Sequence, residues 1–446
     1  MEICTVGGYE EVGKNMTVVK VGDDVFLFDC GFFLPGIIEL QEEEKIGYSL
    51  KGLRRVGGIP DDRVLDSLGW TKKVKAIFLS HAHLDHVGGL PFLIQRYPQA
   101  EVFGTAFTLK VLESLIEDSR IKVQNRLRVV NANSILKIKN STEHVEVEFV
   151  HATHSTIDCA YVALHTNEGT FFYALDLKFD HYPTLGNPPN YARIKEIGNK
   201  KVKALVVDAL YAGTEKKPGG EKIAEHLLEE AFSKIEMGNK AIFITTFSSH
   251  IERLNNIVNI GKKTKREIIF LGRSLAKYVE CATQVGKCPF RNKIKLAKYR
   301  GQVQSILKKV EKNRERYLIV CTGHQGEKNS ILDRISKGET PFNFREGDNL
   351  IFSSSVIPTE VNVEARRRLD LKLRKMGVKL QSDVHVHGHG SREDMRELIR
   401  MLKPEHVIPA HGSLEQEKPF IELSEEFSYV PKKTAHLSTN GNVLKL

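Results

Sequence analysis

Three histidines and an aspartate lie within six positions in the stretch FLSHAHLDHVGGLP, residues 78–91. They are His81, His83, Asp85 and His86, and they follow the apolar run VKAIFL at 74–79. A short apolar run of this kind predicts a buried strand, so the cluster is expected where the strand ends and side chains face a cleft. Neutral imidazoles and carboxylates are the ligands that Zn²⁺ binds in catalytic sites, so the stretch predicts a metal site.

Three more candidate ligands occupy comparable places. His154 follows the apolar run EVEFV, Asp176 ends FFYALD, and His411 follows HVIPA. Taken alone, each is more simply explained as a hydrogen-bonded loop residue. Seven such residues recurring at strand ends indicate a shared centre. Two divalent ions about 3.5–4 Å apart can clamp an in-line displacement at phosphorus.

The composition is that of a globular protein. The chain has 446 residues, of which 41% are hydrophobic and 27% charged. At roughly 150 residues per domain, this length predicts two or three domains. The opening MEICTVGGYEEVGKN carries acidic residues where a signal peptide would be basic, and no apolar run could cross a membrane. We therefore expect a cytoplasmic protein with no membrane partner.

Lys and Arg outnumber Asp and Glu by 66 to 56, and the excess is concentrated in one segment. Residues 287–316 contain eleven Lys or Arg and two Glu. A solvated helix face accounts for most such runs. A polyanionic partner is the alternative, because basic side chains near phosphates gain affinity by releasing counterions. The segment by itself leaves both interpretations open.

The first half of the chain is rich in predicted strands. Apolar runs at 16–21 and 25–31, separated by turn residues, predict a hairpin. Residues 32–66 have weak periodicity and are interpreted as a long loop or insertion. Further strands are expected at 75–80, 145–150, 159–166, 170–175 and 203–207, and helices near 89–97 and 105–119.

From about residue 212, predicted strands alternate with predicted helices, which is typical of a mostly parallel α/β sheet. The segment 378–391 then returns to a predicted strand that ends in histidines. The predicted plan is a first domain over 1–211, an α/β domain inserted over 212–370, and completion of the first domain by 371–446.

The stretch HAHLDHVGG at 81–89 resembles the signature of the metallo-β-lactamase superfamily. The resemblance implies an αββα sandwich with two zinc ions. It assigns His81, His83 and His154 to one zinc and Asp85, His86 and His411 to the other, with Asp176 bridging and Asp29 orienting the loop.

The second half adds a further resemblance. Asp208, His389 and His411 resemble the three extra motifs of the β-CASP nucleases, whose inserted α/β domain serves nucleic-acid cleavage. Members with histidine at the last motif resemble RNA nucleases, whereas the DNA-processing branch typically has an aliphatic residue there. His411 therefore favours RNA as the substrate and partner.

Within the RNA branch, the chain resembles the ribonuclease J family from end to end. The stretches at 7–31, 270–274, 321–327 and 351–358 carry this resemblance. The cleavage and polyadenylation factor type is disfavoured, because a metal motif that begins at residue 81 leaves no room for its N-terminal KH domains.

There are departures from the family pattern. Bacterial members have a further C-terminal domain, so the archaeal form is the closer match. His324 and Ser413 replace the usual family residues, which puts the side-chain roles at those two positions in doubt.

The resemblance implies a two-zinc phosphodiesterase, foremost a 5′→3′ exoribonuclease that prefers 5′-monophosphate ends, with endonuclease activity as an addition. The catalytic residues are predicted to be Asp85, Asp208 and His389. Glycine-rich turns and hydroxyls suit a phosphate, although ordinary capping would also explain the serines. The predicted substrate-binding residues are Ser248, His250, Ser353, Ser354, Ser355, His385, Gly388, His389, Gly390 and Ser391.

Three other functions stay open at this point. An endonuclease that matures RNA 3′ ends would use the same zinc ions without requiring an end. A DNA-repair nuclease is disfavoured by His411, and a non-catalytic nucleic-acid scaffold is disfavoured because no ligand is missing. The resemblance also allows a homodimer.

Overall fold

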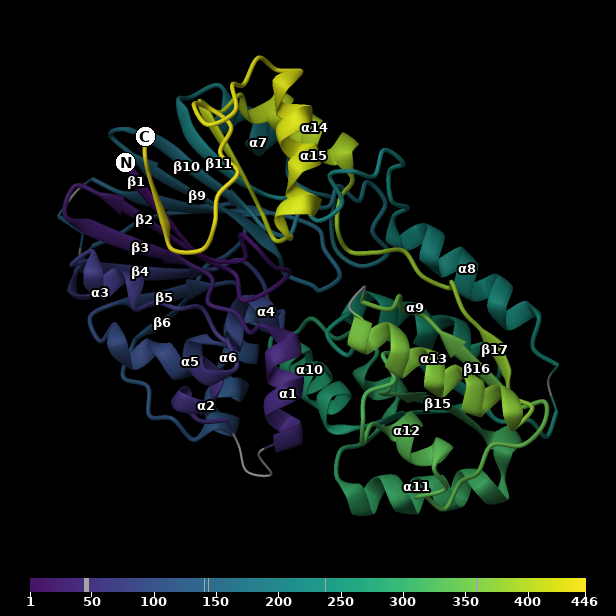
Figure 1. Ribbon diagram of the computed structural model, residues 1–446. Helices are drawn as coiled ribbons and strands as arrows, with labels where there is room; N and C mark the ends of the chain where they lie inside the picture. Colours follow the sequence, from purple (N-terminus) through teal and green to yellow (C-terminus); the bar gives the residue numbers. More distant parts are fainter. Residues whose placement is uncertain (44–47, 140, 143, 237, 358–359) are drawn as a thin grey trace. The chain divides into compact units, whose positions relative to one another are not determined.

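The computed structural model describes residues 1–446 other than 44–47, 140, 143, 237 and 358–359 (Figure 1). These described residues form two compact units. Unit 1 consists of Met1–His181, Pro188–Pro218 and Gly388–Leu446, and unit 2 of Tyr182–Asn187 and Gly219–His387. Within the described residues, no helix combines the length and the apolar character that a membrane span needs.

The first sheet of unit 1 has the strand order β19-β1-β2-β3-β4-β5-β6. β2 and β3 form the predicted antiparallel hairpin, whereas β3, β4, β5 and β6 run parallel to one another. The strands are β1 (Glu2–Gly7), β2 (Met16–Val21), β3 (Asp24–Phe28), β4 (Val74–Leu79), β5 (Glu101–Gly104), β6 (Leu127–Val129) and β19 (Asn442–Lys445).

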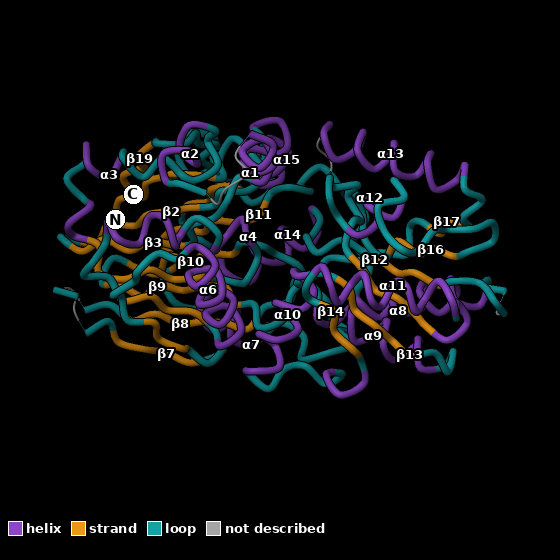
Figure 2. The backbone as a smooth tube through the Cα atoms, turned by 90° about the horizontal axis from the view of Figure 1, so that it is seen from below, coloured by secondary structure: helices purple, strands orange, loops and turns teal. Residues whose placement is uncertain are grey.

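The second sheet of unit 1 has the order β18-β11-β10-β9-β8-β7, and the strands of both sheets are seen in Figure 2. β10, β11 and β18 are parallel, so these three strands end at the same edge of the sheet. The strands are β7 (Ser134–Lys137), β8 (Glu146–His151), β9 (Ala160–Thr166), β10 (Gly169–Ala174), β11 (Val202–Asp208) and β18 (His406–Ala410).

Aromatic side chains fill the space between these two sheets. The ring of Phe28 on β3 lies 5.2 Å from that of Phe78 on β4, and 4.8 Å and 5.3 Å from those of Phe171 and Tyr173 on β10. Alternate residues of the same strands face outward, where Leu27 of β3 packs in a second apolar cluster. Because both faces are buried, the strands of these mixed sheets are nearly continuous apolar runs.

Helices cover the outer faces of both sheets of unit 1, which completes an αββα sandwich and confirms the predicted fold class. The first sheet packs against α1 (Leu34–Glu43), α2 (Leu50–Arg55), α3 (Val64–Ser67), α5 (Leu90–Leu93) and α6 (Ala106–Ser119). The second sheet packs against α7 (Tyr191–Gly198), α14 (Arg392–Leu402) and α15 (Leu414–Glu425).

The prediction of a long loop over 32–66 was wrong. Helices α1, α2 and α3 lie there, although residues 44–47 are outside the described part. Short helices are not stable alone and depend on packing against the rest of the protein. They also contain too few residues to show a clear helical spacing of apolar side chains. Here Leu40, Leu53 and Leu65 are almost fully buried in the outer cluster of the first sheet.

Unit 2 is built on a parallel sheet with the order β14-β13-β15-β12-β16-β17, as the alternation of strands and helices predicts. The strands are β12 (Ile242–Thr245), β13 (Glu267–Leu271), β14 (Lys295–Ala297), β15 (Tyr317–Cys321), β16 (Asn349–Phe352) and β17 (Lys379–Gln381). The helices include α8 (Glu221–Ser233), α9 (Ile251–Lys262), α10 (Arg273–Gln284), α11 (Arg300–Lys312), α12 (Ile331–Ser336) and α13 (Glu360–Lys375).

One predicted strand of unit 2 is shorter than expected. The segment 378–391 is a strand only as far as Gln381, and its histidines lie in the loop that follows. Asp383 has a left-handed backbone with φ of 63°, which is incompatible with a continuing strand. The loop histidines are therefore placed by tertiary contacts rather than by a strand.

Replacing Phe28 with Ala should destabilise unit 1 by about 3–5 kcal/mol, because it opens a cavity between the two sheets. Trp70 is the single tryptophan of the chain and is buried in unit 1, so its fluorescence in a urea titration reports the effect. Val129→Ala is the matched control, since Val129 is 60% exposed, and should change stability by less than about 0.5 kcal/mol. An equal effect of the two substitutions would contradict the packing described here.

Candidate metal centre

The seven predicted ligands lie on loops that follow strands of unit 1. The stretch 81–86 follows β4 and runs into the short helix α4 (Leu84–Val87). His154 follows β8, Asp176 follows β10, and His411 follows β18 directly. The αββα arrangement therefore brings together residues separated by more than 300 positions.

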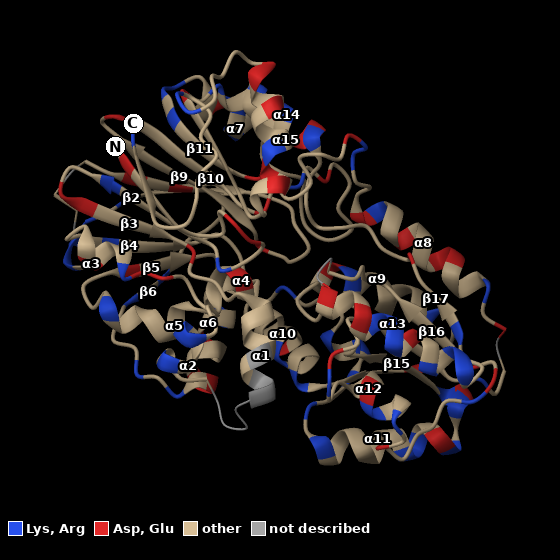
Figure 3. Cartoon of the chain, in the orientation of Figure 1, with Lys and Arg blue, Asp and Glu red and all other residues tan. Residues whose placement is uncertain are grey.

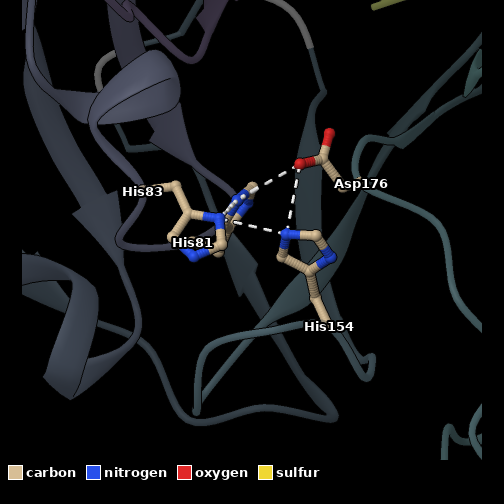
Figure 4. A group of neighbouring side chains, drawn as sticks. All are labelled: His81, His83, His154 and Asp176. Carbon is tan, nitrogen blue, oxygen red and sulfur yellow. Dashed lines mark hydrogen bonds and ion pairs between the residues drawn. The ribbon is translucent and has the colours of Figure 1, made fainter. Parts of the chain in front are cut away.

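Four of these residues form the first group, shown in Figure 4: His81, His83, His154 and Asp176. Their ligand atoms all lie within 4.8 Å of one another. His83 Nδ1 lies 3.1 Å from His81 Nε2 and 3.0 Å from His154 Nε2. Asp176 Oδ2 lies 3.3 Å from His154 Nε2 and 3.6 Å from His81 Nε2.

Asp85, His86 and His411 form a second group, again with ligand atoms within 4.8 Å of one another. Asp176 connects the two groups. Its Oδ2 lies 3.3 Å from His86 Nε2, and its Oδ1 lies 3.7 Å from His411 Nδ1. The structure thus brings all seven predicted ligands together, with Asp176 between the two groups as the resemblance implies. Their role as ligands stays a prediction.

The chemistry of the first group fits a bound cation. Nδ1 of His83 lies at hydrogen-bond distance from Nε2 of both His81 and His154. A single ring nitrogen carries at most one proton, so hydrogen bonds can satisfy these two contacts only in part. Asp176 Oδ1 is buried and accepts no hydrogen bond among the described residues. Buried carboxylates are costly unless they are paired or coordinate a metal. A divalent ion would satisfy both the nitrogens and the carboxylate.

Asp29, at the end of β3, supports the ligand loop. Its Oδ2 lies 2.8 Å from His86 Nδ1 and accepts a hydrogen bond of 2.7 Å from the Ser80 hydroxyl. Its Oδ1 accepts from the Ser80 backbone amide at 2.8 Å. The Ser80 hydroxyl also lies 3.0 Å from His81 Nδ1, so one buried carboxylate orients ligands of both groups.

The loop after β3 and the ligand loop are packed backbone to backbone. The Cys30 amide donates to the His86 carbonyl at 2.7 Å. A Cβ at Gly31 would lie 1.6 Å from the Asp85 carbonyl oxygen, so only glycine fits there. This contact fixes the path of residues 81–86 independently of any bound ion.

Sequence reasoning missed Asn15 as a supporting residue. Its Oδ1 lies 3.0 Å from His411 Nδ1, and its Nδ2 donates to the Asp85 carbonyl at 3.0 Å and lies 3.0 Å from His86 Nε2. Asn15 therefore touches all three members of the second group. Its place in the stretch GKNMTVV, just before β2, was the available signal.

Burial and neighbouring charges set the protonation of the group. Burial lowers the pKa of His81 and His154 well below the usual range, and that of His83 to about 4. At His86, burial is outweighed by Asp176, Asp85 and Asp29, and the pKa is raised well above the usual range.

His389 lies against both groups and is held by Asp208. Its Nδ1 is 2.7 Å from Asp208 Oδ2, and Asp208 also accepts from the amides of Leu177 and Leu210 at 3.3 Å and 3.0 Å. The His389 ring stacks on that of His411 at 5.2 Å. Burial lowers the pKa of His389, but Asp208 and Asp176 outweigh it and raise the pKa to about 9.

The predicted phosphate-binding residues of unit 1 lie in the loop before α14. The Gly388 carbonyl lies 2.7 Å from His154 Nδ1, and a Cβ at Gly388 would lie 2.5 Å from the Ser155 hydroxyl oxygen. Ser391 is fully buried as the N-cap of α14, where its amide donates to Asp394 at 2.9 Å. Gly390 donates its amide to the Leu177 carbonyl.

The remaining predicted substrate-binding residues lie in unit 2. His250 caps α9, and Ser353 to Ser355 follow β16. Ser353 is buried and donates to the Val384 carbonyl at 3.0 Å, whereas Ser355 is exposed and Ser248 half-buried. Their role in binding a substrate stays a prediction.

A buried ion pair that sequence reasoning missed holds several of these residues. Arg253 is fully buried and forms a bidentate pair with Glu221 at 2.9 Å and 2.6 Å. Its Nη1 donates to the Ser353 carbonyl at 3.0 Å and lies 3.1 Å from His385 Nδ1. The same Glu221 carboxylate lies 3.1 Å from His250 Nε2. An arginine on an otherwise apolar face of α9 was the only signal.

The two positions that depart from the family pattern have defined surroundings. Ser413 is the N-cap of α15, and its hydroxyl accepts from the Gln416 amide at 3.4 Å. His324 is buried in unit 2, with its ring 4.4 Å from that of Phe247. Ser413 therefore begins the helix that directly follows His411.

Family models match most of the chain. The metallo-beta-lactamase superfamily matches residues 9–104, and a beta-lactamase superfamily domain matches 63–217. The beta-CASP domain of ribonuclease J matches 239–367. A Zn-dependent metallo-hydrolase RNA specificity domain matches 375–435.

Full-length relatives agree with these matches. A ribonuclease J of Pyrococcus abyssi is 40% identical over 100% of this chain and 97% of its own length. The chain belongs to the ribonuclease J family. A ribonuclease J of Methanocaldococcus jannaschii is 35% identical over 98% of its length, whereas the chain spans 74% of the Thermus thermophilus ribonuclease J at 28% identity. The predicted family, in its archaeal form, is thus confirmed.

Membership of the ribonuclease J family also establishes the class of activity. The chain is a hydrolytic ribonuclease of the metallo-β-lactamase superfamily, as predicted, and membership of this superfamily implies that it binds divalent metal. A solved protein of unknown function from Enterococcus faecalis covers all of this chain with a TM-score of 0.65. At 18% identity it supports the fold alone.

Replacing Asp29 with Asn should weaken metal binding by about 10- to 100-fold, because the substitution removes one of the oxygens that orient His86 and Ser80. Competition with a fluorescent zinc chelator measures the affinity, and circular dichroism checks the fold. Asp61→Asn makes the same chemical change at a side chain that is 59% exposed and should leave the affinity unchanged. Equal zinc affinity in both variants would show that Asp29 does not support the centre.

Proposed function

We propose that this ribonuclease holds two zinc ions and degrades RNA from the 5′ end, with a preference for 5′-monophosphate ends. The observation that carries the proposal is the pair of ligand groups joined by Asp176. Imidazole and carboxylate donors of this kind suit zinc. In the proposal, His81, His83 and His154 would hold one ion, Asp85, His86 and His411 would hold the other, and Asp176 would be shared by both.

Two zinc ions would supply an activated water and neutralise charge on the scissile phosphate. The chain's own residues would then position the phosphate and move a proton. His389 donates Nδ1–H to Asp208 in this arrangement, which leaves Nε2 to donate a proton to the departing 3′ oxygen or to stabilise the charged phosphate. Asp208 fixes the ring by accepting from two backbone amides as well.

The loop of Gly388 and Gly390 supports the preference for a 5′ monophosphate. Glycine-rich turns can bind phosphate through backbone amides. In this loop the amides of Gly390 and Ser391 already donate to Leu177 and Asp394, so a phosphate would have to use the other amides of the loop. Because the Gly388 carbonyl contacts His154 Nδ1, this loop is anchored directly to a proposed zinc ligand. A terminal phosphate held by the loop would lie at a set distance from the scissile bond, which is what stepwise removal of nucleotides needs.

The proposal includes several predictions about the whole molecule. The domain division at residues 211 and 370 stays a prediction, as do a homodimer and a cytoplasmic location. An endonuclease that matures RNA 3′ ends is the main alternative, because the same ligand groups would serve it without an end-binding loop. A DNA-repair nuclease and a non-catalytic scaffold do not agree with family membership.

The direction of attack can be tested with one RNA labelled at its 3′ end and prepared with a 5′ monophosphate, triphosphate or hydroxyl. The proposal predicts rapid release of single nucleotides from the monophosphate form and a slower reaction with the other two. A chelator should abolish all activity, and added zinc should restore it. Internal fragments at equal rates from all three RNAs would instead establish the endonuclease.

Replacing His389 with Ala should lower turnover by about 100- to 10,000-fold while zinc content stays at the wild-type level, because His389 is proposed to move a proton rather than to hold zinc. Turnover and zinc per chain are measured on the same preparation. His226→Ala removes a histidine that is 66% exposed in unit 2 and should change neither quantity. A parallel loss of zinc and activity would make His389 a ligand instead.

A further inference from the structure

Part of the basic segment found in the sequence lies at the surface of unit 2 and is called the basic face, whereas Arg314 of the same segment is buried. Arg291 and Lys293 lie in the 3₁₀ turn η3 (Arg291–Lys293), Lys295 lies on β14, and Arg300 begins α11. Figure 3 shows Lys and Arg at both ends of α11. Acidic side chains neutralise only part of this charge: Glu267 pairs with Lys295 at 2.5 Å and Glu280 with Lys298 at 2.8 Å.

A groove of about 600 Å³ lies within this basic face. It runs between β14, which is the edge strand of the sheet, and the first turns of α11. Its basic lining comes from Arg291 and Lys295, and its floor from apolar side chains such as Ile294 and Ile306. Neither Arg291 nor Arg300 forms an ion pair with a carboxylate among the described residues.

Tyr299 lies two residues before Gly301, which lines the groove, and the tyrosine is 59% exposed. It precedes α11 as its N-cap, and Lys298 Nζ lies 5.8 Å from the ring centroid. At the adjacent Gly301, which lines the groove, a Cβ would meet open space. The aromatic ring, the flanking cations and the open groove therefore occur together within one short segment.

We infer that this face of unit 2 is a second RNA-binding site that holds single-stranded RNA. Single strands are bound by basic grooves that follow the phosphates and by exposed aromatic rings on which bases stack. Arg291 and Arg300 supply the first feature, and Tyr299 supplies the second. None of these residues belongs to the metal centre or to the proposed phosphate loop.

The inference rests on the ribonuclease activity and not on the direction of attack. A single strand is favoured over a duplex because a base stacked on Tyr299 must be unpaired. The site would add affinity for RNAs long enough to reach it, since a second contact on the same molecule binds at high effective concentration. Short substrates would gain nothing from it.

The first test measures binding by fluorescence anisotropy. The metal-loaded protein is titrated with a hydrolysis-resistant phosphorothioate single strand of roughly 30 nucleotides, long enough to cover an extended groove. Arg291→Ala/Arg300→Ala should raise Kd about tenfold and reduce the salt slope by about 1.4, because each phosphate contact contributes about 0.7. Tyr299→Ala should raise Kd about tenfold for the single strand, but not for a duplex of equal length.

Matched controls separate a specific groove from diffuse charge. Lys222→Ala/Lys234→Ala removes two charges from exposed lysines at the two ends of α8 and should leave Kd unchanged. Gly301→Glu and Gly301→Gln place side chains of equal size in the groove. Glu should weaken binding about fivefold more than Gln, because only Glu brings negative charge toward the phosphates. Both should fold, since the position is open and lies in the first turn of a helix.

Hydrolysis of bis(p-nitrophenyl) phosphate reports the metal centre separately. It should stay at the wild-type rate in all of these variants, because none of the substituted residues belongs to the metal centre. Unchanged Kd in the Arg291/Arg300 and Tyr299 variants would overturn the inference, as would an equal loss in the α8 control. A different direction of attack in the RNA-end experiment would leave these binding results unaffected, so the two proposals fail separately.

Discussion

The fold of unit 1 brings histidine nitrogens and the Asp176 carboxylate together at one buried point, where hydrogen bonds among these side chains cannot satisfy all of their polar atoms. His83 Nδ1 faces the ring nitrogens of both His81 and His154 at about 3 Å, and Asp176 reaches both groups. Such a cluster is costly in a protein interior unless a cation compensates it. The surrounding structure holds the cluster in place through hydrogen bonds from behind the ligands, by Asp29, Ser80 and Asn15.

These supporting contacts explain why the centre depends on the whole αββα sandwich. Asp29 follows β3, Ser80 follows β4, and Asn15 precedes β2 of the same sheet, whereas Asp176 and His411 follow strands of the second sheet. The two sheets must therefore pack correctly for the two halves of the site to meet. The aromatic layer around Phe28 and Phe78, with Phe171 and Tyr173, fixes that packing only a few residues from the ligands.

Residue type and spacing predicted much of this architecture. The run of histidines at 81–86 pointed to a metal centre because few other structures need those residues so close together. The alternation of predicted strands with predicted helices after residue 212 indicated a parallel sheet, because few other folds have this order of elements. Strands such as β9 and β11 were found within a residue of their observed bounds, since apolar runs between turn residues are a strong local signal.

What could not be predicted depends on distant partners. Asn15 contacts His411 across 396 positions of the sequence, and Arg253 contacts Ser353 across 100. The residues next to Asn15 or Arg253 in the sequence therefore do not indicate either contact. The helices between residues 34 and 67 were missed for the same reason, because packing against the first sheet stabilises them more than their own sequence does. The family resemblance supplied the pairing of ligands that spacing alone left open.

The order of residues along the chain has a consequence for biosynthesis. His411 and β18 follow the long insertion that forms most of unit 2, and β19 pairs with β1 at the edge of the first sheet. During translation, unit 2 leaves the ribosome and can fold before His411 of the second group has been synthesised. If His411 is a ligand as proposed, the nascent chain cannot assemble a working hydrolytic centre beside the messenger that encodes it. Its own transcript is exposed to cleavage by that chain only after nearly all of it has been read.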